Sequence, residues 1–265
     1  MRRPTLLRSA CLVLAAGLPG AASGQEPARD ETPPMVTDRP DFTESAVAVP
    51  PGRVQVESGY TWARSGDETT HEVGELLVRL GALRGVEARL GLSSLVVVDG
   101  PGPDRSGLAD VSLGLKLDAA EILALAGELE IALIAGATLP TGSAATGGEA
   151  AVPGAVLALG HPLGGRVSAG LNAGWSREAE DGSRFHQGIL SAAVGIELGS
   201  RWGAFLEAFA LFPEGSRQDR VFLDGGATFL LRETLQLDVR AGTALDPDDP
   251  PELFAGLGVS FRFRI

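Results

Sequence analysis

Residues 167–175 read V-S-A-G-L-N-A-G-W, and every second position in this stretch is apolar. The positions between are small or polar: Ser168, Gly170, Asn172 and Gly174. A period of two places alternate side chains on opposite faces of an extended strand. The stretch therefore predicts a β-strand with one apolar and one polar face.

The same alternation recurs from Arg53 to the end of the chain. Helix is expected only in a short turn at 119–126, and the segment 153–160 is apolar on both faces. Taken together, the alternating segments predict twelve strands, with ends placed to within about 2 to 4 residues. They are 53–63, 72–82, 85–96, 108–118, 128–138, 153–160, 165–176, 185–198, 201–212, 219–231, 234–244 and 252–263.

Alternation alone does not distinguish a soluble sandwich or barrel, apolar inside, from a membrane barrel, apolar outside. The predicted connections do, because short and long ones alternate, as in outer-membrane barrels with short periplasmic turns and long external loops. The predicted strands, at about 10 to 12 residues, are also long enough to cross the apolar band of a membrane. The longer connections are polar and rich in Gly, Pro and Asp: 64–71, 97–107, 139–152, 177–184, 213–218 and 245–251.

These observations predict an all-β fold, a transmembrane outer-membrane β-barrel of about 12 antiparallel strands over residues 53–265. A soluble all-β fold with an apolar core is the alternative. Large apolar residues near the predicted strand ends would form the interfacial girdle of a membrane barrel. They are Tyr60, Trp62, Trp175, Phe185, Trp202, Phe212, Phe261 and Phe263.

The N-terminus has the three parts of a secretory signal, which we place at residues 1–24. A basic start precedes an apolar run at 10–18 and small residues at 22–24, and the chain's one cysteine, Cys11, lies inside the apolar run. Cleavage would leave a chain without thiol chemistry or disulfides. Residues 25–52 then form a periplasmic or lumenal lead-in to the barrel.

Composition excludes several classes of protein. The 265 residues are 44% hydrophobic, which is incompatible with a disordered chain. A formal net charge of -12 disfavours nucleic acid as a partner. His71, His161 and His186 have no nucleophile or acid at a recognisable motif spacing, so we expect no enzyme activity. We also expect no cofactor and no metal.

Several stretches across the mature chain carry a family resemblance. The opening T-D-R-P-D-F-T-E-S at 37–45, followed by V-P-P-G-R at 49–53, resembles the start of a bacterial outer-membrane family of transporters of the phenol-degradation meta-pathway. Residues 138–142, 235–238 and 254–263 are similar to later elements of that family. The resemblance implies uptake or export of small organic molecules, with outer-membrane lipid and the barrel-assembly machinery as partners.

If the apolar face points outward, the polar face of each strand lines the lumen. Acids outnumber bases on this face, which predicts a weak preference for cations. The alternative is that these charges pair across strands and close the lumen. The predicted lumen residues are Arg53, Glu57, Glu75, Arg79, Glu87, Arg89, Asp110, Lys116, Glu130, Glu207, Asp238 and Arg240.

The charged stretch before the barrel has two interpretations. Asp38, Arg39, Asp41 and Phe42 either fold into the lumen as a plug or gate, or belong to a periplasmic lead-in that only positions the first strand. As a plug, Arg39 would pair with a wall carboxylate such as Glu57 or Glu130.

The sequence thus predicts an outer-membrane channel or transporter that passes small, aromatic or apolar, molecules. The alternative is a structural or surface-interaction barrel with a closed lumen, which transports nothing.

Overall fold

The computed structural model describes residues 33–215, 217–246 and 250–265. All described residues belong to one compact unit, Pro33–Ile265. The predicted signal peptide at 1–24, and the part of the predicted lead-in before residue 33, lie outside the described residues. Their boundaries stay predictions.

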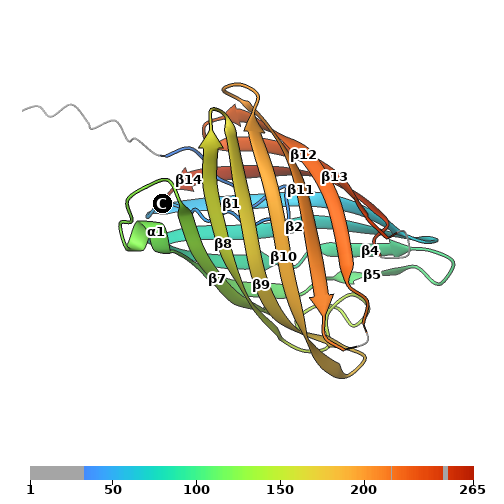
Figure 1. The fold of residues 1–265 in the computed structure, drawn as a ribbon. Helices are drawn as coiled ribbons and strands as arrows, with labels where there is room; N and C mark the ends of the chain where they lie inside the picture. The colour runs from blue at the N-terminus through green and yellow to red at the C-terminus, as the bar shows by residue number, and fades with distance from the viewer. Residues whose placement is uncertain (1–32, 216, 247–249) are drawn as a thin grey trace, which may run out of the picture. The chain divides into compact units, whose positions relative to one another are not determined.

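This unit is an antiparallel sheet closed into a barrel (Figure 1). Closure comes from β1, which pairs with β2 on one side and with the last strand, β14, on the other. The elements are β1 (Arg53–Ser65), β2 (Glu68–Leu83), β3 (Val86–Leu92), β4 (Leu95–Asp99), β5 (Arg105–Leu108), β6 (Val111–Asp118), α1 (Ala119–Ile122), β7 (Glu130–Leu139), β8 (Val152–Gly164), β9 (Val167–Glu180), β10 (Ser183–Glu197), β11 (Trp202–Pro213), β12 (Arg220–Arg232), β13 (Leu235–Ala244) and β14 (Leu253–Arg264).

The 14 strand segments make up twelve crossings, where a crossing is one pass of the chain between the two ends of the barrel. β3 and β4 are two parts of one crossing, because both pair antiparallel with β2. β5 and β6 form the next crossing, since β5 pairs with β4 and β6 pairs with β3. The prediction of a twelve-stranded antiparallel barrel is therefore confirmed, including the strand at 153–160.

Some predicted connections are wrong in length. The expected loops at 64–71 and 177–184 are mostly strand: β1 and β2 are joined by Gly66 and Asp67, and β9 and β10 by Asp181 and Gly182. Both turn glycines have positive φ, +58° and +69°, which suits tight hairpin turns. Apolar and polar residues no longer alternate at the ends of these hairpins, because the strand ends are polar on both faces. The backbone pairing nevertheless continues to the turn.

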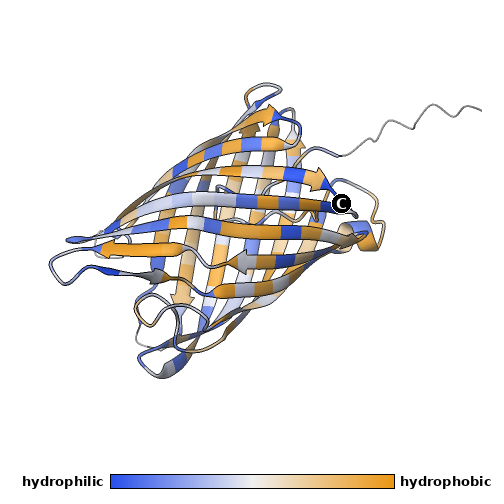
Figure 2. Ribbon diagram, turned by 180° about the vertical axis from the view of Figure 1, so that it is seen from behind, coloured by the Kyte–Doolittle hydropathy of each residue, from blue (hydrophilic) through white to orange (hydrophobic). Residues whose placement is uncertain are grey.

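The barrel is inverted relative to a soluble fold. Apolar side chains point outward, with Leu206 74% exposed, and the exposed set includes Trp175, Trp202, Phe261 and Phe263. Charged side chains fill the inside, where Arg79 and Lys116 are 0% exposed. Hydrophobic and hydrophilic bands alternate along the strands in Figure 2. This inversion rules out a soluble barrel with an apolar core and fits an outer-membrane barrel.

The two ends of the barrel differ. α1 and the C-terminus lie at one end, and the β4–β5 hairpin lies at the other (Figure 1). α1 is shorter than the helical turn predicted at 119–126, and the side chain of Asp118 caps it by accepting from the Glu121 N–H at 2.9 Å. Within the described residues, no helix is both long and apolar enough to span a membrane.

Residues 33–52, which we call the inner segment, precede β1 and run against the wall. At Gly81 on β2, an added Cβ would lie 2.0 Å from the carbonyl oxygen of Pro50. The Gly81 carbonyl also accepts from the Gly52 N–H at 3.0 Å. The wall strand and the inner segment are therefore in backbone contact, and only glycine fits at this position.

We predict that Gly81→Ala displaces the inner segment, because the methyl group would collide with backbone and not with a flexible side chain. The fraction of folded barrel cut by glutamyl endopeptidase between Glu44 and Ser45, followed by mass spectrometry, should rise several-fold. Gly102→Ala is the matched control, since nothing lies within 4 Å of its added Cβ. Equal cleavage in the two variants would contradict the contact.

Candidate functional site in the barrel interior

The inner segment lies inside the barrel, because it contacts strands around the whole wall. Arg262 on β14 donates to the carbonyl oxygens of Pro33 and Pro34 at 2.5 and 3.3 Å. Arg89 on β3 donates to the Glu44 carboxylate at 2.9 and 3.1 Å. On β11, the carboxylate of Glu207 also binds the segment. Strands this far apart in the sheet can share one partner only across the lumen.

Asp38 is the central contact of the inner segment. Its carboxylate accepts from Lys116 on β6 at 2.9 and 3.0 Å and from Arg89 at 2.5 Å, and it lies 3.3 Å from Arg79 on β2. Burial by itself would raise the pKa of Asp38, but Arg79, Lys116 and Arg89 together hold that pKa well below its usual value. Three strands thus place cations around one carboxylate.

Wall carboxylates bind the backbone of the inner segment. Glu57 accepts from the N–H groups of Asp38 and Arg39 at 3.0 to 3.2 Å, and Glu87 accepts from the N–H of Val49 at 2.9 Å. Arg79 lies between the two carboxylates and donates to Glu57 at 2.8 Å and to Glu87 at 2.9 Å. Each buried charge in this group therefore has an opposite charge or a donor.

Arg39 reaches a different carboxylate from the predicted ones. Its guanidinium donates to Glu75 on β2 at 2.6 Å and lies 3.6 Å from Asp238 on β13. The pairing with Glu57 through the Arg39 side chain is wrong, because Glu57 receives only the backbone N–H. Glu130 is exposed at the start of β7.

A bulge in β2 switches the faces of the residues before Glu75, while Glu75 itself keeps the interior parity of Arg79. The register with β1 shifts between Glu57 and Gly59, opposite Gly74 at φ +109° and Glu75 at φ +37°. Val73 and Arg79 share a parity in the sequence, yet Val73 is 46% exposed outside and Arg79 is buried inside. A strict period of two does not anticipate this switch of faces.

Four phenylalanines form an aromatic cluster in the interior. Phe42 of the inner segment stacks on Phe209 of β11, with ring centroids 4.3 Å apart and planes at 12°. Phe209 stacks in turn on Phe222 of β12 at 4.7 Å, and Phe254 of β14 lies 6.4 Å from both. The guanidinium of Arg240 on β13 lies 5.4 Å from the Phe254 ring. We call Phe42, Phe209, Phe222 and Phe254 the aromatic cluster.

Glu207 holds the inner segment beside the aromatic cluster. Its two carboxylate oxygens accept from the N–H groups of Phe42 and Thr43, each at 2.6 Å. The Thr43 hydroxyl also donates to Glu207 and lies 2.8 Å from the Ser191 hydroxyl on β10. Burial, followed by the nearby Glu207 charge, raises the pKa of Asp41 well above its usual value.

The structure brings most of the predicted lumen residues together around the inner segment, but not all of them. Asp110 instead accepts from the N–H groups of Thr141, Gly142 and Gly148 at 2.7 to 3.0 Å and so folds the β7–β8 connection. Arg53 is half-buried at the start of β1, near one end of the barrel. No group of three or more His, Cys, Asp or Glu side chains in the described ranges could hold a metal ion.

Sequence reasoning missed the interior phenylalanines. Phe209 has the same parity as Glu207, and Phe222 the same parity as Asp224, so both lie on the polar faces of their strands. An aromatic residue on a lumen face is a signal that the alternation itself contains. Phe185, predicted for the outer girdle, likewise lies on the interior face of β10, where Gln187 and Ser191 are buried.

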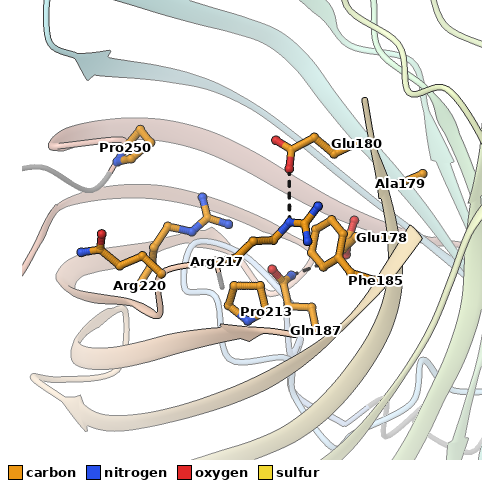
Figure 3. Close-up of a pocket in the computed structure, with 10 residues that line it drawn as sticks. Glu178, Ala179, Glu180, Phe185, Gln187, Pro213, Arg217, Arg220 and Pro250 are labelled. Carbon is orange, nitrogen blue, oxygen red and sulfur yellow. Dashed lines mark hydrogen bonds and ion pairs between the residues drawn. The ribbon is translucent and has the colours of Figure 1, made fainter. Parts of the chain in front are cut away.

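A pocket of about 530 Å³ lies among the strand ends and connections around Phe185 (Figure 3). The guanidinium of Arg217 covers the Phe185 ring at 3.8 Å and lies 3.6 Å from the Glu180 carboxylate. Gln187 and Glu178 line the wall below, 3.5 Å apart. This pocket, which we call the mouth pocket, has one aromatic face and charges of both signs.

We predict that Arg79→Met lowers the free energy of unfolding by about 3 to 5 kcal/mol, because Glu57 and Glu87 would stay buried without their shared cation. Denaturant unfolding of the refolded barrel in detergent micelles measures this change. Arg105→Met is the matched control: Arg105 pairs with Glu68 at 3.1 Å where both side chains are 50% exposed, so its loss should cost about 0 to 1 kcal/mol. Similar losses in both variants would show that the interior network contributes no more than a surface ion pair.

Solved structures of other proteins are similar to this barrel. The NanC porin matches with a TM-score of 0.54 and 12% identity, over 78% of this chain and 98% of that chain. The KdgM porin matches with a TM-score of 0.52 and 10% identity, over 79% and 99%. At these identities the likeness shows the porin-type barrel fold alone. No curated protein sequence matches the chain.

The family assignment comes from sequence and covers nearly the whole described barrel. The profile of the family described as "Putative MetA-pathway of phenol degradation" matches residues 37–263. The match begins inside the inner segment and so includes most of the residues that contact the wall from within. The chain is an outer-membrane β-barrel that belongs to this phenol-degradation family.

Proposed function

We propose that the protein is an outer-membrane channel for small organic molecules, aromatic ones among them, and that the inner segment controls the lumen. The observation that carries the proposal is the aromatic cluster in an otherwise charged interior. Buried charges are expected in a water-filled barrel, but stacked phenylalanines on the lumen faces of β11, β12 and β14 are not.

An aromatic cluster gives a single-ring solute a binding surface inside a polar lumen. Offset or edge-on contacts between rings contribute about 0.5 to 1.5 kcal/mol each beyond area burial. Contacts of this size favour entry without holding the solute too tightly for release, as conduction requires. The mouth pocket, at about 530 Å³, lies within the size range of small-molecule sites.

The inner segment has to move for a solute to pass. Among the described residues it is held mostly by ion pairs and by N–H groups bound to Glu57, Glu87 and Glu207, while Phe42 adds a ring contact and Ala46 packs against alanines of the wall. Water can replace polar contacts of this kind, so release costs less than it would for an apolar plug of equal size. The segment therefore suits a gate.

One observation favours a second candidate, a structural barrel with a closed lumen. Arg79, Glu57, Glu87 and Lys116 are all 0% exposed, which shows that the inner segment fills this part of the interior. A network this well satisfied would also serve a barrel that transports nothing. Conductance separates the two functions.

We predict that deleting residues 37–44 raises single-channel conductance in planar bilayers at least several-fold and favours cations, because the wall then exposes Glu57, Glu87 and Glu207. A deletion of equal length at 142–149, in the β7–β8 connection, is the control and should conduct like the full chain. Both deletions must first show heat-modifiable migration, which reports a folded barrel. A folded Δ37–44 barrel that stays silent would support the closed structural barrel and contradict the channel.

We also predict that conductance rises with pH through the titration of Glu44. Glu44 faces Asp38 on its own segment, Arg89 on β3 and Lys116 on β6; burial and then Asp38 raise its pKa to about 7 from 4.5. Between these values the bound segment keeps a proton that a released segment has lost, so binding of the segment weakens as pH rises through this window. The raised pKa of Asp41 acts in the same direction.

The measurement is the open fraction in planar bilayers at about pH 5 and about pH 8, which brackets the window. Glu44→Gln should reduce the difference, and Glu233→Gln, in the exposed β12–β13 turn, should leave it unchanged. A pH response that is the same in all three proteins would assign the titration to other groups.

A further inference from the structure

Phe42 and Thr43 are held on the wall in the way that a protein holds a ligand. The Phe42 ring stacks on Phe209, and the two successive N–H groups donate to the two oxygens of Glu207 at 2.6 Å each. A ring on an aromatic face and a pair of N–H donors on one carboxylate make a two-part recognition site. The site is formed by β10, β11 and β12, and the inner segment occupies it.

We propose that this is a binding site for small aromatic cations with paired N–H donors, and that Phe42–Thr43 is its built-in competitor. The chemistry follows from the groups that the wall offers. A carboxylate that accepts two parallel N–H bonds matches an amidinium or guanidinium group, and Phe209 and Phe222 match the attached ring. The inference rests on the proposed function, because it names the solute class that the channel would take.

A second, independent observation points to a cationic ligand. Asp224 on β12 lies directly opposite Glu207 in the sheet and is only 6% exposed. Neither of its carboxylate oxygens has a hydrogen-bond partner among the residues that the structure describes. Two adjacent buried acids, Glu207 and Asp224, are costly to ionise together, and a ligand that brings N–H donors removes part of that cost.

The local charges exclude the opposite class of ligand. Glu207 and Asp224 lie opposite each other on the wall and Asp41 is next to Phe42 in the chain, while the cation Arg240 interacts with both Asp224 and the Phe254 ring. An aromatic carboxylate would meet three acids at close range, which disfavours it strongly. A neutral ring could stack on Phe209 but would bring Asp224 no hydrogen-bond donor.

The experiment is isothermal titration calorimetry of the refolded barrel in detergent micelles, with benzamidine as the probe and benzoate and benzyl alcohol as comparisons. Phe42→Ala removes the competing ring and keeps the rest of the inner segment, so benzamidine should bind this variant at least about tenfold more tightly than the full chain. In the Phe42→Ala background, Glu207→Gln should abolish this binding. Glu197→Gln, an exposed carboxylate at the end of β10, is the matched control and should preserve it.

Phe209→Leu in the Phe42→Ala background provides a second variant if the Glu207 variant fails to fold. It keeps both carboxylates and removes only the stacking face, so benzamidine binding should weaken several-fold. Equal benzamidine affinity with and without Phe42 would overturn the proposal, and so would benzoate or benzyl alcohol binding as tightly as benzamidine.

The outcome of this experiment is independent of the channel test. Calorimetry reports binding even in a barrel that does not conduct, so a silent barrel that binds benzamidine would refute transport and support the site. A conducting barrel without benzamidine binding would leave transport standing and overturn the site.

Discussion

The arrangement of the interior depends on the contact between Asp38 and the three cations Lys116, Arg89 and Arg79. These cations project from neighbouring crossings of the wall and would repel one another across an empty lumen. The Asp38 carboxylate removes that repulsion, and Glu57 and Glu87 compensate Arg79 from its other side. Barrel wall and inner segment therefore complete each other: without the segment, Lys116 loses the Asp38 carboxylate and its charge depends on water in the lumen.

This dependence follows from the inversion of the fold. A barrel that turns its apolar side chains toward lipid has only its polar faces to fill the lumen, and twelve crossings enclose more space than wall side chains alone fill. The inner segment supplies the missing volume as backbone, and backbone N–H groups are what the wall carboxylates bind. An acidic interior thus accommodates a peptide segment without needing a matching number of basic side chains.

Alternation predicted the strands, because lipid outside and water inside impose a period of two on every crossing, and the alternation of short and long connections then favoured a membrane barrel. It also placed Glu57, Arg79, Glu87, Arg89, Lys116 and Glu207 on one face, and these residues do meet the inner segment. Three features depend on non-local geometry and were out of reach: the bulge at Gly74 and Glu75, the hairpin ends beyond the apolar band, and the partner of Arg39. The aromatic cluster was within reach, since Phe209 and Phe222 break the polar pattern of their faces.

The two kinds of contact made by the inner segment have different consequences for a channel. Ion pairs around Asp38 are long-ranged and tolerate small displacements, so they set how firmly the segment is held. The contacts at Phe42 and Thr43 are short and directional, so they set where the segment sits. Any solute that takes the place of Phe42 competes with the directional contact alone and leaves the ion pairs in place. Opening by displacement at Phe42 therefore requires only part of the free energy that removing the whole segment would cost.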